Sequence, residues 1–427
     1  MTAPTDGLHD WSRADLAVLV REYLLAGHLI DRAGMPHVVA EFGIDGMREV
    51  AIDEWTGASP VYTRRMQATL DFAGDDVATI FKGMQLDIGA PPQFMDFRYQ
   101  VDDATHGSFR LNSCGALMDV EPMGDGFVLA MCHHIEDPTF DATACATNPR
   151  ARMTPIHRPP RVPADRHPHC HWTVEIDAAA EAVTEPEPAV RIAGTRAARL
   201  PIARVADDGP GAAADGTAAA SAVVDDGRCD YDGPLDPDLW LEDFSRATLV
   251  RIADEVCLQG HLLTLAFSDA VEHRFGPEAA RRVGHKQFVG IAGLTADRLR
   301  RAFDLGRSPT DIATVLELHP AFRPRAYVDV SVDQGEQEER IAVSLGPCDA
   351  LDESVGRAWP ALLVDGDTAV LDAIVTAVEP RARSRFLGAS EDRLMWEVSV
   401  GDEPAPETPE VTLTRFSTGA DFVFHSR

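Results

Sequence analysis

Residues 167–172 read HPHCHW, with histidines at every second position and a cysteine between the last two. In a β-strand, alternate side chains share one face. His169 and His171 are therefore expected to point one way, and Cys170 and Trp172 the other way. Two imidazoles brought to one point by a His-x-His spacing are typical of zinc and non-haem iron sites.

A second reactive stretch, MCHHIEDPTF, covers residues 131–140. If it is helical, Cys132, His133, Glu136 and Asp137 can converge, because positions three or four apart share a helix face. Pro138 favours the end of such a helix near the two acids. A carboxylate beside a histidine can orient the imidazole or bind a metal itself.

Two kinds of chemistry remain open for these residues. In the first, a divalent metal, zinc or iron, lowers the pKa of a bound water, and Glu136 or Asp137 acts as the base. The expected ligands are His133, His169 and His171. In the second, the thiol of Cys132 or Cys170 is the nucleophile and a nearby histidine is its base.

The chain contains an internal repeat. SRADLAVLVREYLLAGHL at 12–29 resembles SRATLVRIADEVCLQGHL at 245–262, at an offset of 233. Further matches follow in the same order at offsets from 235 to 224, as small loop insertions and deletions would produce. We therefore predict a tandem duplication. The expected divisions are a competent first copy (1–177), a flexible linker rich in Ala, Asp, Gly and Pro (178–239), a degenerate second copy (240–402) and a C-terminal tail (403–427).

Each copy is expected to place helices before an antiparallel sheet, which is an α+β class. Apolar residues recur at helical spacing at the start of the first copy, and the period then changes to two. The expected helices are 13–32, 36–55, 60–72 and 75–86. The expected strands are 97–103, 107–114, 150–157 and 168–176, with a mixed segment at 127–145.

The repeat also separates structural residues from reactive ones. Nine of the 22 His and Cys residues lie between 132 and 171, and the matching part of the second copy, 364–396, has none. Both copies must fold, so features kept in both, such as the Gly-His pair at 27–28 and 260–261, are expected to be structural. The reactive cluster is expected to function in the first copy.

The first copy resembles the L-2-amino-thiazoline-4-carboxylate hydrolase-like domain family. The resemblance rests on Cys114-Gly115, on Cys132 with Asp137, and on Cys170 with Trp172, within residues 97–176. It implies a small-molecule hydrolase that opens a C–N bond in a sulfur and nitrogen heterocycle. The histidines of the cluster depart from the family pattern and favour a metal.

A more distant likeness is to vinyl-reductase-type ligand-binding domains. It implies the alternative function, a non-enzymatic sensor or carrier that binds a metal, haem or another small ligand. Under either function, the expected partners are a small molecule and, within the chain, the paired copy.

Composition excludes some partners. A formal charge of −30 and a sequence pI near 4.7 argue against nucleic acid, since phosphate binding requires clustered Lys and Arg. No apolar run approaches the ~20 residues of a membrane helix, and we predict no membrane partner. Seven cysteines at low density, without a leader sequence at the N-terminus, favour a reducing cytoplasm.

Overall fold

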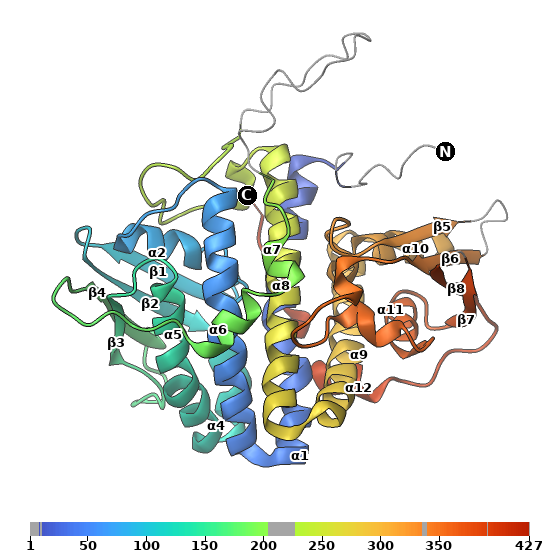
Figure 1. Ribbon diagram of the computed structural model, residues 1–427, viewed down its shortest axis with the longest axis horizontal. Coiled ribbons are helices and arrows are strands. Elements are labelled where there is room, and N and C mark those ends of the chain that lie inside the picture. Colours follow the sequence, from blue (N-terminus) through green and yellow to red (C-terminus); the bar gives the residue numbers. More distant parts are fainter. Residues whose placement is uncertain (1–7, 9–10, 204–226, 335–339, 391, 427) are drawn as a thin grey trace, which may run out of the picture.

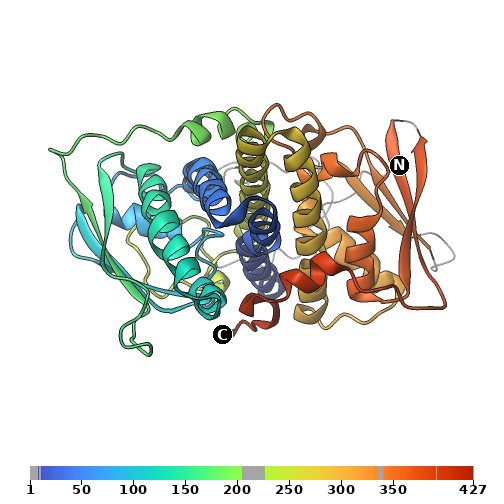
Figure 2. The ribbon, with the colours of Figure 1, turned by 90° about the horizontal axis from the view of Figure 1, so that it is seen from below.

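The computed structural model describes residues 8, 11–203, 227–334, 340–390 and 392–426. Two antiparallel four-stranded sheets flank a central group of long helices (Figures 1 and 2). The protein is therefore of the α+β class, as predicted. Below, the first half means the described residues up to 203, and the second half those from 227 onward.

The first half begins with the longest helix and ends with two short ones. Its helices are α1 (Arg13–Thr69), α2 (Val77–Met84), α3 (Gly115–Val120), η2 (Glu121–Met123), α4 (Asp125–Leu129), the π-helix η3 (Ala130–Ile135), α5 (Glu136–Cys145), α6 (Glu187–Ile192) and α7 (Arg196–Arg199). Its strands are β1 (Met95–Val101), β2 (His106–Cys114), β3 (Ala151–His157) and β4 (Cys170–Ile176).

The second half follows a similar order of elements. Its helices are η5 (Leu241–Asp243), α8 (Arg246–Phe275), α9 (Pro277–Ala302), α10 (Pro309–Leu318), η6 (Pro320–Phe322), η7 (Asp349–Leu351), η8 (Trp359–Leu363), α11 (Ala369–Val378), α12 (Pro409–Thr414) and η9 (Thr418–Asp421). Its strands are β5 (Val330–Gln334), β6 (Arg340–Leu345), β7 (Ala382–Ser390) and β8 (Arg393–Val400).

The two sheets have the same strand order, β1-β2-β4-β3 and β5-β6-β8-β7. In β4 the burial alternates, with Cys170 and Trp172 facing inward and His171 facing outward. The inward face of the first sheet carries a stack of Phe109 and Trp172 with ring centroids 6.2 Å apart. Trp172 and its repeat partner Trp396 are both almost fully buried, so both belong to the core.

The central helices break at equivalent glycines. Helix α1 is kinked at Gly43 (φ 75°, ψ 177°), and Gly276 (φ 86°, ψ 166°) separates α8 from α9, an offset of 233. These dihedrals are accessible essentially to glycine alone. A helix boundary was predicted near Pro36, but the helix continues through Pro36 and Pro60, which lie inside α1. Tertiary packing therefore overrides the local effect of proline here.

Helix α1 packs against α8 and α9 through reciprocal contacts. Glu22 forms a bidentate ion pair with Arg298, and Arg65 forms one with Glu255, each with a shortest distance of 2.8 Å. The two pairs are equivalent, because Glu255 lies 233 positions after Glu22 and Arg298 lies 233 positions after Arg65. Phe42 stacks directly on Phe275, also 233 positions away, with ring centroids 3.8 Å apart. Reciprocal contacts between equivalent residues are those expected when two halves are related by a two-fold axis.

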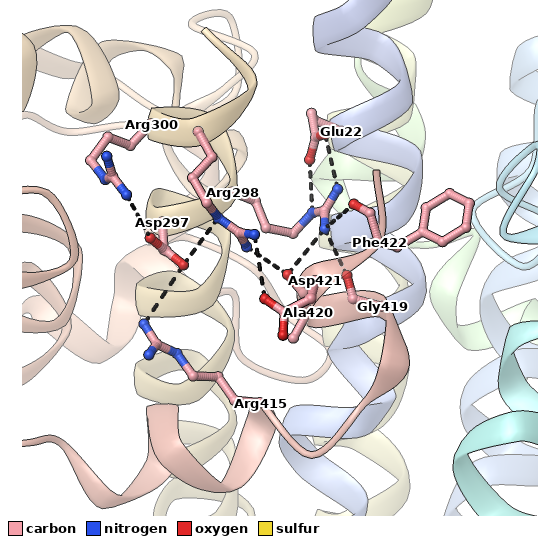
Figure 3. A network of polar contacts seen from close by, with 10 residues as sticks. Glu22, Asp297, Arg298, Arg300, Arg415, Gly419, Ala420, Asp421 and Phe422 are labelled. Atoms are coloured by element: carbon pink, nitrogen blue, oxygen red, sulfur yellow. Dashed lines mark hydrogen bonds and ion pairs between the residues drawn. The ribbon is translucent and has the colours of Figure 1, made fainter. Parts of the chain in front are cut away.

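The end of each half is fixed by the arginine of one of these ion pairs. Arg65 donates to the carbonyls of Ala198 and Leu200 at the end of α7. Arg298 donates to the carbonyls of Gly419, Ala420 and Phe422, as Figure 3 shows. Figure 2 shows the C-terminal segment (red) returning from the second sheet to the central helices.

These segments correct the predicted linker and tail. Residues 187–199, expected in a flexible linker, form α6 and α7, and α6 packs on α1 and α8. Residues 409–421, expected as a tail, form α12 and η9. Alanine and proline suggested disorder, but small side chains also allow close helix packing. The part of the expected linker at 204–226 lies outside the described residues.

The four strands expected in the first half are confirmed, with ends shifted by at most two residues. In the parts of the chain that are described, no helix is both long enough and apolar enough to cross a membrane.

Candidate functional site

The first half contains a cavity of about 390 Å³ between α1, the inner face of the β1–β4 sheet and the segment from α3 to α5. Most of its lining is apolar, and six methionines contribute to it: Met35, Met47, Met84, Met95, Met123 and Met131. The second half also contributes, through Leu413 and Phe416 of the C-terminal segment. Methionine is flexible and polarisable, so this lining can adapt to ligands of irregular shape.

The reactive stretch at 131–140 forms one wall of the cavity. It begins in the π-helix η3, which carries Met131 and Ile135 into the lining, and Glu136 follows at the start of α5. Single π-helical turns are rare and occur frequently at functional sites. The predicted convergence of these residues assumed α-helical spacing, and the π-helix alters which residues share a face.

Glu136 is the one member of the predicted acid pair that lines the cavity. Burial raises the pKa of its carboxyl to about 8, although the Arg158 guanidinium partly opposes this effect. At neutral pH the group is therefore mostly protonated and can donate a hydrogen bond or a proton.

Asp137 lies elsewhere. Its half-exposed carboxylate forms an ion pair with Arg158, and it does not line the cavity. The next residue, Pro138, continues α5 and does not end the helix, because proline is tolerated in the first turn. The two adjacent acids therefore point to different environments, and Glu136 is the candidate for chemistry.

The two predicted cysteines lie at or next to the cavity wall. Cys170 lines the cavity, and Cys132 is buried beside it and close enough to interact electrostatically with Cys114, Cys170 and Glu136. Burial raises the pKa of all three thiols, that of Cys114 to about 12. At neutral pH they are protonated, and a thiol in that state is a weak nucleophile.

The three predicted metal ligands have separate partners. Nε2 of His133 contacts the carbonyl of Pro159 at 2.7 Å. His169 is buried, and its Nδ1 accepts from the backbone N–H of Cys114 at 3.1 Å. His171 lies on the outer face of the sheet, where its ring centroid is 6.2 Å from that of His157. These three histidines therefore do not fit one metal centre.

More broadly, within the described ranges no three His, Cys, Asp or Glu side chains are grouped so that they could hold a metal ion. The binding of zinc or iron stays a prediction.

Several charged groups in the cavity were not predicted from sequence. Asp31 accepts from Trp55 Nε1 at 2.7 Å, and Asp87 accepts from the hydroxyl of Tyr62 at 2.8 Å and the backbone N–H of Gly89 at 2.6 Å. Burial raises the pKa of Asp87 to about 6. All five of these residues line the cavity.

Asp31 is paired with a second buried carboxyl, that of Glu54. Burial raises the pKa of both groups, and that of Glu54 rises well above its usual value because Asp31 adds to the effect. Two adjacent buried carboxyl groups cannot both ionise at low cost, so the pair retains a proton.

His28 contributes a neutral imidazole. It is buried and lines the cavity, and burial together with the nearby Arg32 guanidinium lowers its pKa to about 3. Within the described residues, neither ring nitrogen has a hydrogen-bond partner of normal geometry. Its repeat partner His261, in contrast, contacts the carbonyl of Arg323 through Nε2 at 2.8 Å.

The space beside His261 is filled. Trp359 stacks on Phe288 with ring centroids 4.9 Å apart, and its ring lies 6.2 Å from that of His261. The two Gly-His pairs, expected to be structural in both copies, thus differ, since His28 faces the cavity and His261 is packed among aromatic rings. Asp31 and Glu54 are buried in α1, but many other charged residues lie in the same helix, so the sequence carries no distinct signal for this part of the site.

Comparison with protein-family models, with curated proteins and with solved structures finds no match for this chain.

Proposed function

We propose that the protein is a small-molecule-binding protein whose site is the cavity in its first half. The observation that carries this proposal is a cavity of about 390 Å³ with a mostly apolar lining and a few buried polar groups. Ligand pockets of ~300–1,000 Å³ with this composition are typical of sites for small organic molecules. The proposal develops the sensor or carrier alternative inferred from sequence.

Filling the cavity with a larger side chain should weaken ligand binding. Met131 lines the cavity on η3, and Met131→Trp places a larger side chain in the space a ligand would occupy. Isothermal titration calorimetry with 2-phenylethanol, a neutral aromatic probe, should give saturable 1:1 binding to the unaltered protein. The variant should bind at least about tenfold more weakly, since it loses most of the apolar contact area.

The matched control is Met118→Trp. Met118 is exposed on α3 and does not line the cavity, so this variant should bind the probe as the unaltered protein does. Equal loss of binding in both variants, or equal retention, would contradict the placement of the site.

A hydrolase is the second candidate, and the positions of Glu136 and Cys170 in the cavity lining favour it. Because burial raises the pKa of the thiols, the proton donor in this version is Glu136, which would protonate the leaving nitrogen as water attacks the adjacent carbon. The C–N bond breaks, and the carboxylate then recovers a proton from the attacking water.

The hydrolase candidate predicts turnover of a 2-amino-thiazoline-4-carboxylate probe, followed as loss of the heterocycle by chromatography. Glu136→Gln should reduce the rate by ~10²-fold or more, because the amide cannot give up a proton. The Asp137→Asn variant, altered in an adjacent acid outside the cavity, should keep the rate. A probe that remains intact with the unaltered protein rejects this candidate and leaves the binding proposal standing.

We further infer that the two halves descend from one duplicated domain. The shared strand order, the crossed ion pairs and the stacked Phe42 and Phe275 support this inference. Under it, the first half kept the ancestral cavity, and the second half replaced the corresponding space with Trp359 and its neighbours. The second half then serves mainly to support and cover the first.

A further inference from the structure

The apolar cavity has polar atoms for which the chain supplies no partner. Both nitrogens of His28 and Oδ1 of Asp31 are buried and lack a hydrogen-bond partner within the described residues. Both side chains are more than nine-tenths buried, and both line the cavity. Buried polar groups are nearly always hydrogen-bonded, so unpaired atoms on side chains that line a cavity point to a ligand group that completes them.

The carboxyl groups are gathered around Tyr62, which lines the cavity. Asp31, Glu54 and Asp87 each raise the pKa of the buried Tyr62 hydroxyl, which places all three near its ring. They come from the two arms of α1 and from the segment after α2. Trp55 Nε1 donates to Asp31 Oδ2, and Asp31 shares a proton with the adjacent Glu54. Asp31 Oδ1 has no donor of normal hydrogen-bond geometry among the described residues, and Asp31 lines the cavity.

The one arginine in the cavity lining, Arg32, does not balance these acids. Its Nε donates to Asp119 at 3.1 Å. Asp119 also accepts from the Ser417 hydroxyl at 2.6 Å and from the backbone N–H of Thr418 at 2.7 Å. The charge of Arg32 is therefore matched within the chain.

The remaining groups do not supply a positive charge either. His28 is neutral at physiological pH because burial lowers its pKa, and Glu136 is mostly protonated. The carboxyl pair of Asp31 and Glu54 and the Asp87 carboxyl consequently give the cavity an excess of negative charge.

We propose that the ligand carries a protonated amine, whose N–H groups donate to Asp31 Oδ1 and to the neutral imidazole of His28, while its apolar part lies among the methionines. This inference rests on the proposed binding function and adds the class of ligand. An ammonium group has only donors, which matches a carboxylate and an unprotonated imidazole nitrogen. Its charge-assisted hydrogen bonds are stronger in a low-dielectric site than in water.

The test compares three probes of similar size that differ in charge, 2-phenylethylamine, 2-phenylethanol and 3-phenylpropionate, by calorimetry at pH 7. The amine should bind at least about tenfold more tightly than the alcohol, and the carboxylate should bind most weakly. Asp31→Asn should reduce the affinity for the amine at least about tenfold and leave that for the alcohol within about twofold.

Asp137→Asn is the matched control, because it removes a carboxylate that is close in sequence to Glu136 but outside the cavity. If Asp31→Asn does not fold, Asp87→Asn replaces it, with the same expected preference. Equal affinities for amine and alcohol, or tighter binding of the carboxylate, would overturn the amine inference and leave the binding function intact. Absence of binding by all three probes would overturn both.

Discussion

Replacing Arg298 with methionine is expected to lower the free energy of unfolding by about 3–5 kcal/mol, because it leaves the buried Glu22 carboxylate without its partner. Both side chains are less than one-tenth exposed, at 4% and 7%. The substitution also removes the donor shared by the carbonyls of Gly419, Ala420 and Phe422. Denaturant unfolding, followed by circular dichroism, measures the change.

Arg65→Met should have a similar effect, since Arg65 pairs with Glu255 and donates to two carbonyls at the end of the first half. The control is Arg340→Met, which breaks an ion pair in which the arginine is two-thirds exposed. Surface pairs of this kind contribute about 0–1 kcal/mol. Equal, small losses in all three variants would show that the crossed pairs do not hold the halves together.

Glu136→Gln is expected to change how stability depends on pH. The native carboxyl has a pKa of about 8, and an unfolded glutamate titrates near 4.5. Between these values the native state holds a proton that the unfolded state has released, so stability falls as the pH rises. The free energy of unfolding of the unaltered protein, relative to that of the variant, should therefore decrease by about 2–4 kcal/mol from pH 5 to pH 8.

Denaturant midpoints at intervals between pH 5 and pH 8 measure this difference. Glu407→Gln, at an exposed position, is the control and should follow the unaltered protein throughout. His28, with its lowered pKa, acts in the opposite direction and destabilises the native state as the pH falls below 6.5. A difference between the unaltered protein and Glu136→Gln that stays constant with pH would contradict the burial of the carboxyl.

The sequence predicted the sheets well because period-two alternation directly records which side chains face the core. The alternation around Trp172 correctly put Cys170 and Trp172 on one face of β4 and His171 on the other. His169, expected to share the face of His171, lies before β4 and is buried. The helix pattern was read less well at Pro36, where proline and a change of composition resembled an end of the helix. Burial against α8 and α9 on both sides of that position keeps the helix intact, and no local pattern contains that information.

For the candidate site, sequence spacing identified Glu136 and Cys170, which both reach the cavity. It also joined His133 with His169 and His171, which the structure separates, because spacing cannot show how a π-helix and an inner strand of a sheet are placed in space. His28 was treated as structural since its Gly-His pair occurs in both copies. Its role differs from that of His261 only through what packs nearby, which is Trp359 in the second half.

The C-terminal segment of the second half completes the cavity of the first half, which is the proposed binding site. Leu413 and Phe416 close part of the cavity, and Ser417 and Thr418 hold Asp119, yet all four follow the second sheet in the chain. A first half produced alone would lack this cover, and Arg32 would lose some of the groups that fix its partner. Fragments expressed separately should therefore bind a ligand only after the two halves reassociate.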